Sequence, residues 1–178
     1  MKKLLSLFCT IFMTTLILVG CSSAKDTTKK EEAVRTVSTV RGDVNVPANP
    51  KRVIATYGMG DVLALGVKPV ATYDAKGSAY EKEVEGLPVW EKFEPEEIMK
   101  YDPDLILVVS EEKIDEFSKI APTVYIPFTT LNMEERIAFL GEVLNKKEEA
   151  EKAQSDFKEK INNAKMFRPC LSFSPDRA

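Results

Sequence analysis

Hydrophobic positions from Val34 onward form short continuous runs that alternate with longer runs at helical spacing. The short runs are typical of strands, and five of them follow an initial hairpin-like stretch. These strand candidates lie at 53–55, 69–72, 87–89, 105–109 and 124–126. The run at 105–109 is apolar at every position, as expected of a parallel strand covered by helices on both faces.

Helix-like segments separate the strand candidates, at 61–65, 79–84, 95–101 and 114–120. This alternation predicts an α/β fold, a Rossmann-like lobe in which helices flank a mostly parallel sheet. The stretch before it predicts a hairpin with strands at 34–40 and 44–46 and its turn at Gly42 and Asp43.

Two longer helices follow the lobe. Asn132 and Glu135 have the spacing of a capping box that opens a helix over 133–144. A second helix is predicted over 147–166, with its apolar residues in one narrow stripe. The segment 167–178 contains two prolines and two serines and continues neither pattern. It is assigned as an atypical tail, and both a native tail and a cut or frame-shifted end stay open.

The first residues have the pattern of a secretory signal, because two lysines precede an uncharged stretch over 4–19. That stretch is shorter than the roughly 20 residues that span a bilayer. Residues 18–21 resemble a bacterial lipobox, in which the cysteine is acylated and becomes the first mature residue. We therefore expect a signal peptide at 1–20, a lipid on Cys21 and a polar tether at 21–33. The expected location is the extracytoplasmic face of the cell membrane.

Composition narrows the possible functions. The 178-residue chain has no histidine, which excludes Ser-His-Asp and Cys-His catalysis and histidine-based metal sites. A net charge of -3 gives no support for a nucleic-acid partner. Cys9 lies in the signal and Cys21 is expected to be acylated, so Cys170 has no partner for a disulfide. We expect neither an enzyme nor a bound cofactor.

Aromatic and hydroxyl side chains follow the strand candidates. Ligands gather at the carboxyl ends of the strands in an open parallel sheet. The residues placed there are the candidate ligand-binding residues Tyr57, Tyr73, Trp90, Ser110 and Phe128. Each of them alone is also compatible with a core or surface role. A dinucleotide site is disfavoured, because the third glycine of the fingerprint that begins at Gly58 is replaced by Leu63.

Several ordered segments resemble one family, the ferric-siderophore and vitamin B12 binding proteins of ABC importers. The segments 49–53 and 60–70 resemble the family's opening, and 96–98 with 102–107 resemble its helix-to-strand segment. The segment 120–124 matches the next strand entry. The resemblance runs from 34 to 166, so 34–145 is assigned as the ligand-binding lobe and 146–166 as an inter-lobe helix.

The resemblance implies two α/β lobes that hold an Fe(III)-siderophore between them, in a protein expected to be a monomer. It implies that Glu96 docks on the permease and that Trp90 contacts the ligand. The carboxylate of Glu96 would also complement the dipole of a helix start. Family members are much longer than this chain, and only their first lobe and connecting helix are matched. We therefore expect weak binding or none.

Three alternatives stay open at this point. One is a cobalamin- or haem-binding member of the same family, and another is a structural surface lipoprotein without a small ligand. The third is an α/β enzyme, which would need a phosphate loop or an acid/base constellation that the sequence does not show. The type of siderophore is also open among catecholates, hydroxamates and citrate complexes.

Overall fold

The computed structural model describes residues 33–166. The predicted signal peptide, Cys21, nearly all of the tether and the tail at 167–178 lie outside the described residues. Within the described part of the chain, no helix has both the length and the apolar character needed to cross a membrane.

The lobe begins with an antiparallel hairpin of β1 (Val34–Thr39) and β2 (Gly42–Pro47). Thr39 pairs with Gly42, so the turn is formed by Val40 and Arg41. The predicted turn at Gly42 and Asp43 is therefore wrong by two residues. Asp43 instead belongs to β2, where its carboxylate accepts a hydrogen bond of 2.7 Å from the Ser38 hydroxyl.

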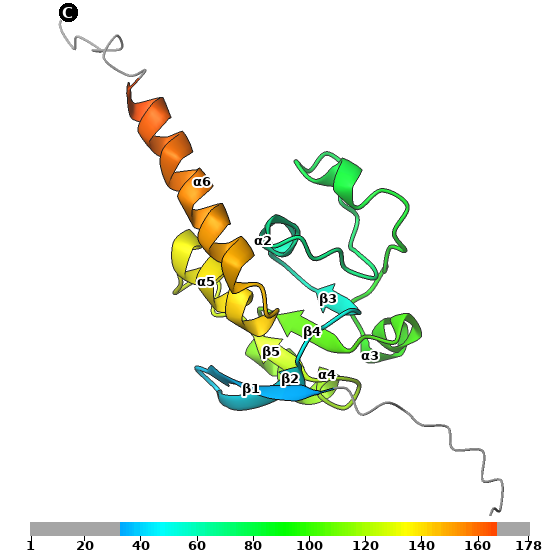
Figure 1. Ribbon diagram of the computed structural model, residues 1–178. Helices are drawn as coiled ribbons and strands as arrows, with labels where there is room; N and C mark the ends of the chain where they lie inside the picture. Colours follow the sequence, from blue (N-terminus) through cyan, green and yellow to red (C-terminus); the bar gives the residue numbers. More distant parts are fainter. Residues whose placement is uncertain (1–32, 167–178) are drawn as a thin grey trace, which may run out of the picture. The chain divides into compact units, whose positions relative to one another are not determined.

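The central sheet contains β3 (Val53–Ala55), β4 (Leu105–Val108) and β5 (Thr123–Tyr125), all parallel and in that order (Figure 1). The two other strand candidates, 69–72 and 87–89, form only one parallel bridge, between Thr72 and Val89. Each of these segments contains a proline, which has no N–H group to donate to a ladder.

The two bridged segments nevertheless continue the sheet beyond β3. The Val70 amide donates to the Val53 carbonyl at 3.0 Å, and the Trp90 amide donates to the Thr72 carbonyl at 3.0 Å. From β3 the chain therefore runs outward on one side of the sheet and then returns to build β4 and β5 on the other. The connectivity reverses between β3 and β4, which makes their carboxyl ends the topological switch point.

Both faces of the sheet are buried. Alternate residues of β3 and β4 enter two separate cores, with Ala55 and Leu107 in one and Ile54 and Ile106 in the other. This confirms the prediction from the apolar run at 105–109. The hairpin, α2 (Met59–Ala64) and α5 (Met133–Val143) supply the first core. The second core is supplied by α3 (Pro95–Ile98) and α4 (Ile114–Phe117).

Three of the predicted helices are shorter than the sequence indicated. The segment 79–84 contains only a 3-10 turn, η1 (Glu81–Glu83), and lies between two glycines with positive φ, Gly77 and Gly86. A second turn, η2 (Met99–Tyr101), follows α3, and a third, η3 (Glu111–Lys113), precedes α4. The capping box of Asn132 and Glu135 is confirmed at the start of α5.

The long helix α6 (Lys147–Met166) has the predicted bounds and runs back along α5 (Figure 1). The two helices approach closely at Gly141, where a Cβ atom would lie 2.5 Å from the Cβ of Ala150. Ala150 is the anchor of α6 and is 3% exposed, whereas Phe157 and Ile161 are only half-buried. The prediction of an α/β lobe that ends in a long helix is confirmed.

The segments 49–53 and 102–107, which carry part of the family resemblance, are hydrogen-bonded to each other. The Asp104 carboxylate accepts hydrogen bonds from the backbone amides of Lys51 at 2.7 Å and Arg52 at 3.0 Å. The Arg52 side chain donates in return to the Asp102 carbonyl at 2.6 Å. These bonds join the amino ends of β3 and β4, so these residues hold the sheet together at the edge opposite the switch point.

Candidate functional site

Two predicted site residues meet at the carboxyl edge of the sheet. Tyr57 follows β3 and Phe128 follows β5, and their rings pack edge to face with centroids 4.8 Å apart. Tyr57 is 52% exposed, an unusual position for a large aromatic ring. The pair lies at the switch point, where an open α/β sheet binds its ligands.

Two hollows share these rings. The Tyr125 hollow, of about 250 Å³, is lined by Tyr57, Val109, Tyr125, Phe128 and Thr129. The Arg136 hollow, of about 230 Å³, is lined by Tyr57, Gly58, Met59, Gly60, Asp61, Tyr73, Tyr80, Phe128 and Arg136. Each is smaller than the roughly 300–1,000 Å³ of most small-molecule sites.

Gly58 allows the aromatic pair to pack against the backbone. Its φ is +69°, and an added Cβ atom would lie 3.4 Å from both the Phe128 ring and the Asp61 carboxylate. The glycine therefore serves the turn after β3 and the close approach of Phe128. This is the close backbone approach that the two glycines after the strand suggested, here to a neighbouring side chain.

An ion pair lies beside the aromatic rings. Arg136, from the first turns of α5, donates through Nε and Nη2 to the Asp61 carboxylate of α2. Its guanidinium carbon also lies 4.1 Å from the centre of the Phe128 ring. The side chains of Arg136 and Asp61 are only 13% and 17% exposed, so the pair is largely shielded from water.

Sequence reasoning missed this pair. The hydrophobic pattern predicts helices over 61–65 and 133–144, but it gives no sign that Asp61 and Arg136, which are 75 positions apart in the chain, form a pair. One local signal was available, because Arg136 stands between Met133 and Leu140 at helical spacing. A charged residue on an apolar stripe often has a partner across the interface.

Tyr73 and Tyr80 form the far wall of the Arg136 hollow, and their hydroxyl groups are hydrogen-bonded to each other. Burial is the main cause that raises the pKa of Tyr73, and the bond to Tyr80 raises it further. The phenol therefore stays protonated at neutral pH. It offers a ligand a neutral hydroxyl group rather than a phenolate.

The structure places Trp90 and Ser110 outside both hollows. Trp90 is 6% exposed and packs in the second core. Its ring centroid lies 6.1 Å from that of Tyr73 and 5.9 Å from that of Phe93. Ser110 is exposed after β4, and its carbonyl accepts a bond of 3.2 Å from the Lys113 amide. Their contact with a ligand stays a prediction.

Two adjacent glutamates at the start of α3, Glu96 and Glu97, have different surroundings. The Glu97 carboxylate accepts hydrogen bonds of 2.9 Å from the backbone amides of Glu91 and Lys92. These bonds lower its pKa below the ordinary value. The side chain of Glu96 is exposed, and this glutamate is the one predicted to dock on a permease.

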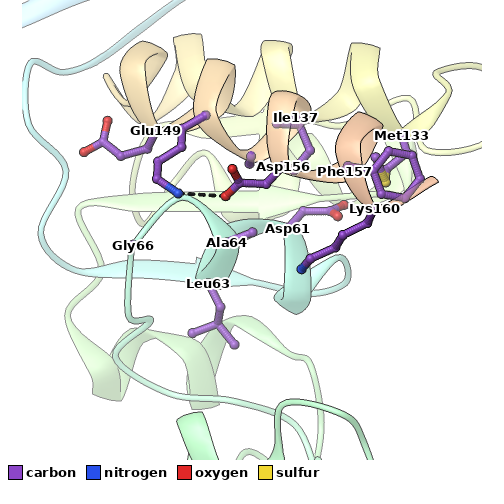
Figure 2. Close-up of a pocket in the computed structure, with 12 residues that line it drawn as sticks. Asp61, Leu63, Ala64, Gly66, Met133, Ile137, Glu149, Asp156, Phe157 and Lys160 are labelled. Carbon is purple, nitrogen blue, oxygen red and sulfur yellow. Dashed lines mark hydrogen bonds and ion pairs between the residues drawn. The ribbon is translucent and has the colours of Figure 1, made fainter. Parts of the chain in front are cut away.

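A larger groove lies between α2 and the two long helices (Figure 2). It has a volume of about 500 Å³ and a mostly apolar floor that includes Leu63, Ile137 and Phe157. Asp61 lines this groove as well as the Arg136 hollow. The groove lies between helices and away from the switch point, so the two smaller hollows are the candidate ligand site.

Metal binding by the protein's own side chains is not supported for residues 33–166. In this part of the chain, no three His, Cys, Asp or Glu side chains are arranged to hold a metal ion. A metal carried within an organic chelate needs no such group.

The hollows lie at the switch point of the sheet, where open α/β folds bind their ligands. The chain belongs to the periplasmic binding protein family, whose family model matches residues 56–166. Its members are binding components of transport systems and not enzymes. The family resemblance and the expectation of a non-enzymatic protein are both confirmed.

The relatives give the resemblance more detail. The iron(3+)-hydroxamate-binding protein YxeB of Bacillus subtilis is 30% identical over 93% of this chain and 54% of its own length. The probable siderophore-binding lipoprotein YfiY of the same organism is 31% identical, with shares of 93% and 56%. This chain therefore spans about half the length of these curated relatives.

One solved structure is also matched over about half of its length. Staphylococcus aureus SirA, in complex with staphyloferrin B, is 30% identical with a TM-score of 0.60. The match covers 72% of this chain and 48% of SirA.

Proposed function

We propose that this chain binds a ferric siderophore and delivers it to the permease of an ABC importer. The observation that carries the proposal is the exposed Tyr57 ring, packed on Phe128 where two hollows meet at the switch point. Family membership and the ligand in the name of YxeB support the same class of ligand.

The residues that line the hollows suit a metal ion that is already chelated by an organic ligand. A siderophore saturates the coordination of iron and presents organic groups to the protein. Tyr57 and Phe128 offer apolar ring faces, and the Tyr73 and Tyr80 hydroxyls offer hydrogen bonds. Because the raised pKa of Tyr73 keeps its phenol protonated, that residue is poorly suited to ligate haem iron as a tyrosinate.

The same proposal includes the means of delivery. A lipid on Cys21 would hold the protein on the extracytoplasmic face of the membrane, and the name of YfiY as a lipoprotein supports this. Glu96 would dock on the permease, and its exposed side chain at the start of α3 is compatible with that role. The helix at 146–166 would lead toward a second lobe.

Binding by this chain alone would be weak. Each hollow is smaller than a usual ligand site, so little of a siderophore surface would be covered. Association must first offset the lost translational and rotational freedom of the two partners, and a small contact leaves little surplus.

Fluorescence of Trp90 tests the proposal, because it is the single tryptophan of the chain and packs on Tyr73. The 178-residue chain would be titrated with a ferric hydroxamate, a ferric catecholate, ferric citrate and cobalamin. Free tryptophan corrects for absorption by the chelates. We expect saturable quenching by a ferric chelate.

Tyr57→Ala should weaken that binding at least tenfold. Met99→Ala is the control, because Met99 is a comparably exposed apolar residue outside both hollows. Absence of saturable quenching from a chain shown to be folded by circular dichroism would contradict the proposed function.

A further inference from the structure

The two hollows carry a balanced charge. Of the residues that line them, only Asp61 and Arg136 are charged, and the other charged side chains of the described part lie elsewhere. These two side chains are paired with each other and largely shielded from water. A ligand in the Arg136 hollow therefore meets a cation that already has its counter-ion.

The geometry shows why Arg136 keeps that counter-ion. A guanidinium has five N–H donors in one plane, and Nε and Nη2 of Arg136 both point at the Asp61 carboxylate. The face of the same group lies on the Phe128 ring. The stack on Phe128 and the ion pair with Asp61 together fix the plane of the guanidinium, so its Nε and Nη2 donors face α2.

The surrounding groups add no net charge. The raised pKa of Tyr73 keeps its phenol neutral, and this hydroxyl group is hydrogen-bonded to that of Tyr80. Behind Asp61, the groove carries side chains of both signs, the acids Glu149 and Asp156 and the bases Lys152 and Lys160. Lys152 and Asp156 are paired with each other at 2.7 Å.

Ferric siderophores differ in the charge at the metal. Three hydroxamate groups carry one negative charge each and cancel the charge of Fe(III), so a tris-hydroxamate centre is neutral. Three catecholate groups carry two negative charges each, so with Fe(III) they form a centre with a net charge of about -3 by the same arithmetic. A shielded site without net positive charge disfavours the second kind, because a desolvated anion needs a compensating partner.

We propose that Asp61 is the internal counter-ion of Arg136, and that this neutral pair makes the lobe select neutral ferric tris-hydroxamates over anionic ferric tris-catecholates. The inference rests on the proposed function and narrows its ligand class. Asp61 and Arg136 are then specificity-determining residues of the site.

Two substitutions move this selectivity in opposite directions. Asp61→Asn leaves the cation uncompensated and should favour the anionic chelate, whereas Arg136→Gln leaves the carboxylate uncompensated and should disfavour it. A purely structural defect would weaken both chelates together and leave their ratio unchanged. The ratio of the two dissociation constants is therefore the readout, and either variant tests the proposal if the other fails to fold.

The exposed pair of Glu134 and Lys158, 3.0 Å apart, supplies matched controls. Glu134→Gln changes the net charge as Asp61→Asn does, and Lys158→Gln changes it as Arg136→Gln does. Both controls alter charges on α5 or α6 outside the two hollows. They should leave the ratio within twofold of the unsubstituted chain.

The experiment measures the affinity of the 178-residue chain for ferrichrome, an uncharged tris-hydroxamate, and for ferric enterobactin, a trianionic tris-catecholate. Trp90 quenching and equilibrium dialysis give the dissociation constants. We expect at least tenfold tighter binding of ferrichrome. Asp61→Asn should reduce this preference at least tenfold, and Arg136→Gln should increase it.

The outcomes separate the two proposals. Equal or tighter binding of ferric enterobactin by the unsubstituted chain would overturn the selectivity and leave the proposed function standing. The selectivity is also overturned if both variants move the ratio in one direction, or if the controls move it as far. Binding of neither chelate would overturn the selectivity, and the proposed function is refuted if ferric citrate also fails to bind.

Discussion

At the scale of single residues, Gly58 links the backbone to the site. It takes a positive φ directly after β3, and the Phe128 ring occupies the space beside its missing side chain. An L-residue in this conformation is strained by roughly 1–2 kcal/mol. One glycine therefore sets both the course of the chain and the position of an aromatic wall.

Gly58→Ala should lower the free energy of unfolding by about 1–2 kcal/mol, because of that strain. It should also weaken binding of a ferric chelate, because the new methyl group would lie 3.4 Å from the Phe128 ring, at the close limit of van der Waals contact, and so restrict the position of that ring. Gly86→Ala is the control, since Gly86 has a φ of +79° and open space around it. Urea unfolding should show a similar loss in both variants, whereas Trp90 titration should show a binding defect only for Gly58→Ala. Equal binding by the two variants would contradict the role given to Gly58.

Residues also show how far the sequence could predict the site. Tyr57 and Phe128 were predicted together because each follows a strand of the same parallel sheet, and strand ends are visible in a hydrophobic pattern. The Asp61–Arg136 pair could not be found in this way, since it depends on how α2 and α5 cross. Trp90 was grouped with the other aromatics, but its side chain turns into the second core.

At the scale of elements, the prediction succeeded where burial is complete and failed where proline or glycine interrupts the chain. The segment 105–109 contained β4, because residues buried on both faces leave a continuous apolar run. The segments 69–72 and 87–89 have the same apolar character, but Pro69 and Pro88 remove ladder donors. Helix 147–166 was found because its stripe is uninterrupted.

The contact between α5 and α6 gives a prediction at this scale. In Gly141→Ala, the new Cβ atom would meet the Ala150 Cβ at 2.5 Å and the Lys146 carbonyl oxygen at 3.1 Å. Neither atom is the end of a flexible side chain, so the helices must shift, and overpacking of this kind costs about 1–3 kcal/mol. We expect a lower midpoint of urea unfolding.

Gly60→Ala provides the contrast, because Gly60 is also helical and its added Cβ would lie at an ordinary 3.6 Å from the Tyr80 ring. Alanine is the better helix former by up to about 1 kcal/mol. This variant should therefore be as stable as the original chain or more so. Destabilisation of both variants to the same extent would contradict the close-packing argument.

The loop before α3 predicts a dependence of stability on pH. The pKa of Glu97 is lowered in the folded chain, first by the bonds from the Glu91 and Lys92 amides. A lowered folded-state pKa stabilises the protein above the ordinary pKa of 4.5, and this stabilisation is lost as the pH falls through the folded value. Glu97→Gln should therefore be less stable at pH 7, and its stability should approach that of the original chain in acid.

Urea unfolding between pH 7 and pH 3 measures this difference. Glu96→Gln is the adjacent control, because it removes a neighbouring carboxylate while keeping the bonds that the Glu91 and Lys92 amides donate to Glu97. Its difference from the original chain should change less between pH 7 and pH 3 than that of Glu97→Gln. A constant difference between Glu97→Gln and the original chain across the whole range would rule out the linkage.

At the scale of the whole molecule, the chain spans about half the length of its curated relatives. If the ligand is held between two lobes, as the proposed function supposes, this lobe supplies only part of the contact surface. We expect YxeB to bind its ferric hydroxamate at least a hundredfold more tightly than this chain does. Parallel titrations of the two proteins with one chelate measure this, and equal affinities would show that a single lobe suffices.

The packing of α6 has a consequence for its backbone amides. Ala150 is buried, and Gln154 donates to the Glu134 carbonyl at 2.7 Å, but the side chains at 162–164 are exposed. A helix of twenty residues is about 30 Å long, and tertiary contacts rather than intrinsic propensity supply most helical stability. Opening of the hydrogen bonds should become steadily easier from Ala150 toward Ala164. Hydrogen–deuterium exchange along α6 would then be slow at its beginning and fast beyond residue 158, giving a gradient of protection within one continuous helix.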